Sequence, residues 1–350
     1  MHVSISDIAE MTGVSAMTVS RVVNGNSSVS ETTRKKVLDA INKTGYRKDV
    51  FASINSSKRK GIRKKKHIAV NFPVSYLSEN AFFDFFSRIN MTVISELQKM
   101  GVDYSIVHID DNIQATDWEP LLSCDAVIYC GSLSMPALRK VKELNLDIGA
   151  LSICFSMDGI SSVNPDDSLG GLLAARHFYG KKHRHLMCLF VRDDSNFTDR
   201  YLSFESNCRL LSPDIKIDAL SYARDDVKNN FLEELLEDYF SKNNPDGVFV
   251  LNGYDTMLVY KTLRNMSIKI PTEIGLLGYD EFDIYNYLDT PLSRISFDRS
   301  EVGRSAAALA CSIAAGKISS PRKVLIPVQL VDMKSVINKS DMKKSKGARA

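Results

Sequence analysis

The sequence has no long hydrophobic run and no closely spaced pair of cysteines, and each absence excludes a class of protein. No stretch approaches the roughly 18 consecutive apolar residues of a transmembrane helix, and the longest apolar segment, 306–315, is interrupted by Cys311 and Ser312. The first residues lack the charged and then apolar profile of a secretory signal peptide. The six cysteines form no CxxC motif, which is typical of reduced thiols and not of disulfides or a zinc site. We therefore expect a cytoplasmic protein with no membrane partner, metal or other cofactor.

The sequence also lacks the common catalytic motifs. It contains no P-loop, GxSxG or HExxH segment. The histidines near Cys188 do not predict a metal site, because His185 alternates into a predicted strand. Pairs of adjacent aspartates point in different directions on a strand or loop and usually cap helices; they occur at 110–111, 166–167 and 225–226. These observations predict that the protein is not an enzyme.

Charge is distributed unevenly along the chain. The net charge is only +3, but residues 1–66 carry 14 basic and 5 acidic residues. The last 13 residues carry 5 basic and 1 acidic residue, and the long segment between the two carries 26 basic and 36 acidic residues. A basic head on an acidic body is typical of nucleic-acid binding, because neutralising phosphates supplies most of the non-specific affinity.

Hydrophobic patterning divides the 350 residues into a small helical head and a larger α/β body. Helical periodicity extends to residue 46, and a polar, basic linker follows at 53–66. Short β-rich runs then alternate with amphipathic stretches, which predicts parallel sheets covered on both faces and, with about nine strands, two lobes. The expected strands are 68–72, 104–109, 126–130, 148–153, 186–191, 219–222, 248–251, 274–277 and 324–331. The expected helices are 82–100, 169–179, 200–211, 227–241, 256–266 and 302–315.

Residues 5–24 have the spacing of a helix-turn-helix. Gly13 stands where a tight turn needs a positive φ, and Ser15 stands where its side chain can cap the second helix. Val19 and Val22 would face the interior, which leaves Arg21 on the outer face, where it can make a bidentate contact to guanine. The alternative is a plain amphipathic helix pair. We expect the second helix to present Ala16, Met17, Thr18, Ser20 and Arg21 to the major groove of DNA.

A third helix is expected from about residue 31 to residue 43. Ser30 can cap it, and Gly45 can end it. The apolar residues Val37, Leu38 and Ile41 are expected to face the interior of the head.

The head resembles that of the LacI/GalR family of bacterial transcription regulators. The segments that carry the resemblance are SISDIAEMTGVSAMTVSRVVNG at 4–25, SSVSETTRKKVLDAI at 27–41 and TGYR at 44–47. The resemblance implies that Ala16, Met17 and Arg21 read bases. It also implies that a second set of polar side chains mainly contacts phosphates, namely Ser15, Thr18, Ser20 and Asn24.

The resemblance is weaker after Tyr46. The family usually has a Pro-Asn pair there, followed by an Ala and by a Leu that enters the minor groove from a hinge helix. In this chain Lys48 replaces the Pro, Ala52 is retained and Asn55 takes the Leu position. Ala52, Ile54 and Asn55 are therefore the hinge candidates for DNA contact. Either Ile54 replaces the apolar wedge or the operator is not kinked.

The body resembles the effector-binding core of the same family, which is similar to periplasmic sugar-binding proteins: two Rossmann-like lobes joined by three crossovers, with the ligand between them. The segments SENAFF at 78–83, VNPDD at 163–167, RYLSF at 200–204 and IGLLGYDE at 274–281 carry this resemblance. A sugar site needs polar groups for hydroxyls and aromatic faces for C–H patches. The effector-binding candidates are Phe82, Phe83, Arg200, Tyr222, Asn252, Asp255 and Asp280. The alternatives are core packing for Phe82 and a salt bridge for Arg200 and Asp280.

These expectations combine into one architecture. A small all-α helix-turn-helix domain at 1–48 is followed by a hinge or linker at 49–66 and a two-lobed α/β core. The remaining boundaries are 67–162 with 293–323 for the first lobe, 163–292 with 324–335 for the second, and 336–350 for a basic disordered tail.

The predicted function follows from this architecture. We expect a sequence-specific regulator, a repressor of a sugar-utilisation operon, that binds a palindromic double-stranded DNA operator as a homodimer. Helix 82–100 of the first lobe is the expected dimer contact, and a small sugar-like effector is expected to control DNA affinity. The alternative is a ligand-independent DNA-binding regulator with a degenerate effector cleft. A sugar kinase fused to a DNA-binding head would need a glycine-rich phosphate loop, which the sequence lacks.

Overall fold

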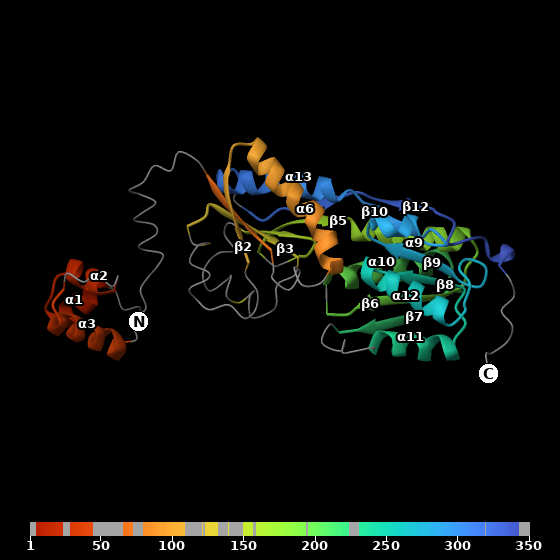
Figure 1. Ribbon diagram of the computed structural model, residues 1–350, viewed down its shortest axis with the longest axis horizontal. Coiled ribbons are helices and arrows are strands. Elements are labelled where there is room, and N and C mark those ends of the chain that lie inside the picture. The colour runs from red at the N-terminus through yellow and green to blue at the C-terminus, as the bar shows by residue number, and fades with distance from the viewer. Residues whose placement is uncertain are drawn as a thin grey trace. The chain divides into compact units, whose positions relative to one another are not determined.

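The chain forms two compact units, Met1–Lys64 and Lys65–Ala350, each with its own core (Figure 1). A computed structural model describes residues 5–23, 29–44, 66–72, 80–108, 121, 123–131, 139, 150–156, 159–193, 195–223, 231–318 and 320–342. Within this part of the chain, no helix is long and apolar enough to span a bilayer.

The head consists of α1 (Ile5–Thr12), α2 (Ala16–Val23) and α3 (Glu31–Thr44). Its core contains Ile8, Val19 and Val37, whose side chains are fully buried. Gly13 has φ +65°, as the turn between α1 and α2 requires. The Oγ atom of Ser15 accepts a hydrogen bond from the backbone N–H of Thr18 at 3.1 Å, so the expected cap of α2 is present.

The start of α3 agrees with the sequence, and one residue of its expected interior does not. The Ser30 side chain accepts a hydrogen bond from the Thr33 N–H at 3.4 Å. Val37 and Ala40 face the core, but Leu38 is 44% exposed. Successive residues of a helix are about 100° apart, so the face that buries Val37 turns Leu38 towards solvent. The expectation that Leu38 packs inward is wrong. The side chain of Ile41 and the whole of Gly45 lie outside the described residues.

The body contains two six-stranded sheets, and each makes one lobe. The first sheet has the order β11-β5-β4-β3-β1-β2, and all of its strand pairs are parallel. Its strands are β1 (His67–Asn71), β2 (Asp103–Val107), β3 (Ala126–Cys130), β4 (Ala150–Ile153), β5 (Ser161–Pro165) and β11 (Lys323–Ile326). The helices α6 (Asn80–Lys99) and α13 (Arg299–Ala314) pack on one another and on this lobe.

The second sheet has the order β12-β10-β9-β8-β6-β7 and is parallel except for the pair of β10 and β12. Its strands are β6 (His185–Val191), β7 (Lys216–Tyr222), β8 (Gly247–Val250), β9 (Gly275–Tyr279), β10 (Ser293–Phe297) and β12 (Val328–Val331). Its helices are α9 (Asp167–Gly180), α10 (Ser195–Leu211), α11 (Phe231–Lys242) and α12 (Gly253–Asn265). The short 3-10 helices η3 (Asp283–Asn286) and η4 (Lys339–Asp341) complete the lobe.

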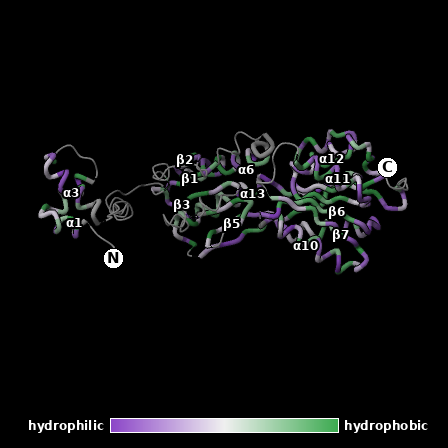
Figure 2. Tube along the Cα trace, turned by 90° about the horizontal axis from the view of Figure 1, so that it is seen from below, coloured by the Kyte–Doolittle hydropathy of each residue, from purple (hydrophilic) through white to green (hydrophobic). Residues whose placement is uncertain are grey.

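Both faces of the second sheet are buried, as the sequence predicts for a parallel sheet. Along β6, Leu186, Cys188 and Phe190 belong to the core cluster that contains Phe178 of α9 and Phe204 of α10. Met187, Leu189 and Val191 belong to the cluster of α11 and α12. This alternation follows from the two-residue period of a strand, and the hydrophobic strands β3 and β6 lie inside their lobes in Figure 2.

Three differences concern the strands and the lobe boundaries. The expected single strand 324–331 is two strands in different sheets, because Pro327 between them cannot donate a ladder hydrogen bond. The sequence analysis also missed β5 and β10. With β5 and β11 in the first sheet and β10 and β12 in the second, the three crossovers follow Pro165, Phe297 and Ile326. The boundaries expected at 162, 292 and 323 therefore move towards the C-terminus.

Glycine allows α9 and α10 to pack closely. A Cβ atom on Gly171 would lie 2.6 Å from the backbone nitrogen of Phe204, whereas a Cβ atom on Gly180 meets nothing within 4 Å. We expect Gly171→Ala to lower the free energy of unfolding by about 1–3 kcal/mol, because the helices must separate. Gly180→Ala is the matched control and should be neutral or stabilising by up to about 1 kcal/mol. Urea unfolding followed by circular dichroism measures both, and equal stability of the two variants would contradict the close packing.

Candidate functional site

The first candidate site is the outer face of α2. Met17 is 65% exposed, and Ala16 and Arg21 are exposed beside it. The buried residues Val19 and Val22 anchor the opposite face. The helix therefore presents a flexible apolar side chain and a guanidinium group to a partner while its other face is fixed in the head core.

Two hydroxyls lie at the start of the same helix. The Oγ atom of Ser15 and the Oγ1 atom of Thr18 are 2.9 Å apart, next to backbone N–H groups of the first turn. Hydroxyls at a helix N-terminus are suited to phosphate oxygens. The other DNA-contact candidates, namely the side chain of Ser20 and the residues Asn24, Ala52, Ile54 and Asn55, lie outside the described residues.

The second candidate site lies at the carboxyl ends of the strands in the second lobe and contains a buried arginine. Arg200 of α10 is only 4% exposed. Its Nε donates to Asp167 Oδ1 at 2.6 Å, and its Nη1 donates to the carbonyl oxygen of Leu251 at 2.6 Å. The guanidinium carbon lies 3.8 Å from the ring centroid of Tyr279, and Nη1 lies 3.7 Å from Asp280 Oδ1. The cluster thus joins α9, α10 and the ends of β8 and β9.

Burial controls the ionisation of this cluster. Burial raises the pKa of Asp167 and of Asp280, and the positive charge of Arg200 opposes both shifts. Burial by itself would lower the pKa of Arg200, but Asp167, Tyr279 and Asp280 raise it above its ordinary value. The guanidinium therefore stays charged and needs the carboxylates as partners. A salt bridge between Arg200 and Asp280, the alternative from the sequence, is present.

Asp280 is unusual in its backbone and in its hydrogen bonding. Its φ is +69°, a left-handed conformation that is rare for residues other than glycine, asparagine and aspartate. Its Oδ2 accepts a hydrogen bond from the N–H of Gly253 at 3.0 Å. Its Oδ1 is buried and accepts no hydrogen bond within the described part of the chain. This oxygen is an acceptor that a ligand donor can satisfy.

The other polar candidates are joined to one another. The hydroxyl of Tyr222 donates to the Asp255 carboxylate at 2.7 and 2.9 Å, and Asn252 Nδ2 donates to Asp255 Oδ2 at 2.7 Å. Asn252 also caps α12, since its Oδ1 accepts a hydrogen bond from the Asp255 N–H at 2.8 Å. The Asp255 side chain is almost completely buried. These residues hold the shape of the site, and Arg200 and Asp280 form a separate cluster.

Several residues at this site were not predicted from the sequence. The sequence predicted a helix-capping role for Asp167, yet its carboxylate is the closest acidic partner of Arg200. Phe85 contacts the second lobe, whereas Phe82 and Phe83 lie near the start of α6 and their side chains are outside the described residues. Asn196 donates from its side chain to the carbonyl of Cys154 at 2.5 Å. Only the VNPDD segment carried a signal in the sequence, because the other contacts depend on how the lobes pack.

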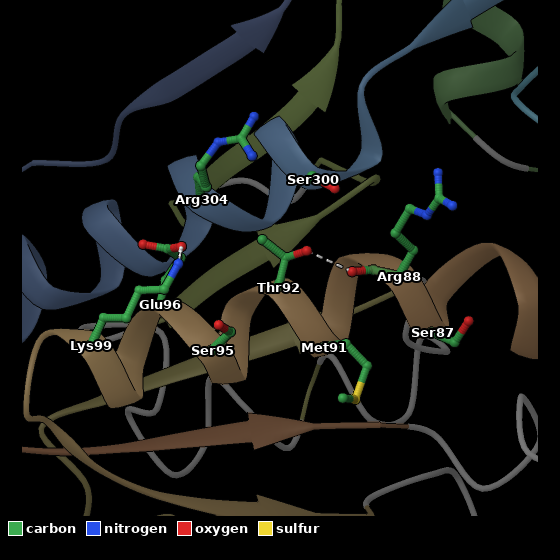
Figure 3. Close-up of a pocket in the computed structure, with 9 residues that line it drawn as sticks. All are labelled: Ser87, Arg88, Met91, Thr92, Ser95, Glu96, Lys99, Ser300 and Arg304. Carbon is green, nitrogen blue, oxygen red and sulfur yellow. Dashed lines mark hydrogen bonds and ion pairs between the residues drawn. The ribbon is translucent and has the colours of Figure 1, made fainter.

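A third feature is a groove of about 430 Å³ on the first lobe, between α6 and α13 (Figure 3). Thr92 lies between the two helices, and the exposed side chain of Met91 points away from α13 at the edge of the groove. The lining residues are Ser87, Arg88, Met91, Thr92, Ser95, Glu96, Lys99, Ser300 and Arg304. Among the described residues no group of three or more histidine, cysteine, aspartate or glutamate side chains is placed to hold a metal ion.

Two family models match the chain, one on each side of the linker. Residues 4–49 match the bacterial regulatory proteins of the lacI family, and residues 175–336 match a periplasmic binding protein-like domain. The HTH-type transcriptional regulator DegA of Bacillus subtilis (strain 168) is 23% identical over 341 residues, which cover 95% of this chain and 97% of the relative. The sucrose operon repressor of Escherichia coli is 26% identical over 313 residues, which cover 87% and 92%.

Solved structures of similar fold cover nearly the whole chain. The lac repressor dimer bound to operator and the anti-inducer ONPF has a TM-score of 0.66 at 19% identity, covering 96% of this chain and 100% of that chain. The CelR–cellobiose complex has a TM-score of 0.63 at 19% identity, covering 95% and 99%. With matches to its head, to its core and to full-length relatives, the chain belongs to the lacI family of bacterial regulatory proteins.

Proposed function

We propose that this protein is a cytoplasmic, sequence-specific transcriptional repressor that binds DNA through α2, and that a small effector in the core controls its DNA affinity. The observation that carries the proposal is the α2 face, where Arg21 and Met17 are exposed on a helix fixed by a buried core. Such a helix fits the major groove, where bidentate arginine contacts distinguish guanine from other bases. The protein is a regulator and not an enzyme, in keeping with its family.

We expect Arg21→Ala to remove most of the preference for an operator, selected from random DNA by the wild-type protein, over unrelated DNA. A bidentate arginine–guanine contact contributes about 1–3 kcal/mol of discrimination. Non-specific binding should survive with nearly the same salt dependence, because other basic residues supply it. Fluorescence anisotropy at several salt concentrations measures both quantities. Lys36→Ala, an exposed change on α3, is the control and should lower the affinity for operator and for unrelated DNA by the same factor. Full specificity in Arg21→Ala would contradict the assignment of the reading helix.

The proposed effector is sugar-like and binds at the carboxyl ends of the strands. Doubly wound sheets bind ligands at this edge, and Asp280 Oδ1 is a buried acceptor there. A sugar hydroxyl is a suitable donor for such an oxygen. Among similar solved structures are complexes with cellobiose and with ribose, so those two sugars and sucrose are sensible first probes.

We expect one class of sugar to raise the melting temperature of the wild-type protein, because a ligand that binds only the folded state stabilises it. Asp280→Asn should lose that rise while keeping operator binding, since it weakens the acceptor without removing the side chain. Asp283→Asn, an exposed aspartate on η3, is the matched control and should respond normally. A normal response in Asp280→Asn would contradict the assignment of Asp280. No response of the wild type to any sugar would favour the ligand-independent alternative.

The proposed repressor is a homodimer, because two heads on a two-fold axis read a palindrome. The groove between α6 and α13 fits a second copy of this chain. If the two α6 helices pack antiparallel about an axis near Thr92, Arg88 of each copy faces the partner's acidic Glu96. Exposed Met91 is then buried at the centre.

This arrangement predicts a charge-swap result. Arg88→Glu should raise the dimer dissociation constant at least about tenfold, because it places like charges together. Adding Glu96→Arg to that variant should restore most of the affinity. Sedimentation equilibrium measures the dissociation constants. Failure of the second change to restore affinity would exclude this pairing while leaving DNA binding by α2 untouched.

A further inference from the structure

Two phenylalanines from different lobes stack on one another. The ring centroids of Phe85 and Phe282 are 6.4 Å apart, and the ring planes differ by 24°. Phe85 belongs to α6, which packs on the first lobe, and Phe282 lies between β9 and η3 of the second lobe. Phe85 also meets Phe297 at the end of β10, with centroids 6.1 Å apart. The aromatic contact therefore bridges the two sheets.

Each ring is held in place by its own lobe. Phe85 packs edge-on against Phe86, with centroids 4.9 Å apart, and its carbonyl oxygen accepts a hydrogen bond from Arg299 Nη1 at 3.4 Å. Phe282 lies so close to the first residue of α12 that a Cβ atom on Gly253 would be 1.9 Å from its Cε2 atom. The contact thus joins two braced side chains, so little side-chain entropy remains to be lost.

The bridge is connected to the effector candidates through the backbone. Gly253, which Phe282 covers, donates its N–H to Asp280 Oδ2 and follows the capping residue Asn252. The hydroxyl of Tyr285 donates to the Gly253 carbonyl at 3.1 Å, and the ring of Tyr285 contacts Phe282. A movement of Phe282 therefore alters the surroundings of Asp280, whose Oδ1 is buried and accepts no hydrogen bond in the described part of the chain.

Cys154 reports on the same interface from the other lobe. It follows β4 and accepts the cross-lobe hydrogen bond from Asn196. Burial raises the pKa of its thiol, and the nearby charge of Asp280 raises it further. The backbone of Cys154 thus lies in the interface between the lobes, and the charges of the Arg200 cluster act on its half-buried side chain.

We propose that Phe85 and Phe282 form a latch that stabilises the closed arrangement of the two lobes, which is the arrangement in which these rings stack. Loss of the contact shifts the core towards an open arrangement in which Cys154 is exposed. The energy of the latch sets the starting equilibrium that any effector must change. This inference concerns the core alone and stands whether or not the protein binds DNA or a sugar.

The test uses the native cysteines of the full chain. Brief reaction with N-ethylmaleimide, followed by peptide mass spectrometry, gives a modification rate for each thiol. Cys154 and Cys311 are both half-buried, and Cys188 and Cys208 are buried. Cys154 reports lobe opening, Cys311 on α13 serves as the reference outside the interface, and Cys188 and Cys208 report unfolding of the second lobe. Opening and unfolding are thereby distinguished within one molecule.

We expect Phe282→Ala to accelerate modification of Cys154 about tenfold, since an aromatic pair contributes on the order of a tenfold change in an equilibrium constant. The rates at Cys188, Cys208 and Cys311 should stay unchanged. Tyr287→Ala, which removes an aromatic ring that is 82% exposed on the same segment, is the control and should leave Cys154 at its wild-type rate.

The double variant Phe85→Ala/Phe282→Ala provides the decisive comparison. If the rings act through one another, its Cys154 rate equals that of either single variant. The latch would be overturned if the Cys154 acceleration in the double variant equalled the product of the two single accelerations. An unchanged Cys154 rate in Phe282→Ala would also overturn it. If Phe282→Ala accelerates Cys188 and Cys208 as well, Phe282→Leu replaces it, because leucine still fills the space over Gly253. Selective acceleration of Cys154 in Phe282→Leu supports the latch, and its absence overturns it.

Discussion

The buried charge of Arg200 is the constraint on which the organisation of the core depends. A guanidinium that is 4% exposed must be paired, because an uncompensated buried charge costs several kcal/mol. Its partners come from α9, from the end of β9 and from the carbonyl of Leu251 after β8. Satisfying one charge therefore fixes the carboxyl edge of the second sheet. Asp280, which has a left-handed backbone, also contacts the start of α12, because its Oδ2 accepts a hydrogen bond from the N–H of Gly253.

This pairing separates the residues that shape the proposed effector site from Asp280, the residue that we propose meets the effector. Tyr222, Asn252 and Asp255 satisfy one another, so a ligand would have to break existing hydrogen bonds to use them. Asp280 keeps one carboxylate oxygen without a hydrogen bond in the described structure. Phe282, which contacts Phe85, also covers Gly253, whose N–H donates to Asp280. The contact between the lobes is therefore connected to the oxygen that we propose binds the ligand.

The sequence predicted those parts of the structure that depend on local rules. Gly13, Ser15 and the spacing of Val19 and Val22 specify the head, and the β-rich runs specify most strands. The strands β5 and β10 were missed because SSVNP and SRISF contain polar residues that are buried only through partners elsewhere. Arg294 and Ser296, for example, both donate to Glu281. The contact of Phe85 with the second lobe likewise depends on the packing of the lobes, which no local pattern encodes.

Selection of DNA from a random pool by the full-length protein shows most directly whether α2 reads bases. We expect enrichment of a palindrome, because two copies of the α2 face, related by a two-fold axis, read two half-sites of the same sequence. Retained DNA without any common sequence, bound only through salt-sensitive contacts, would contradict it, because the exposed face of α2 would then read no bases.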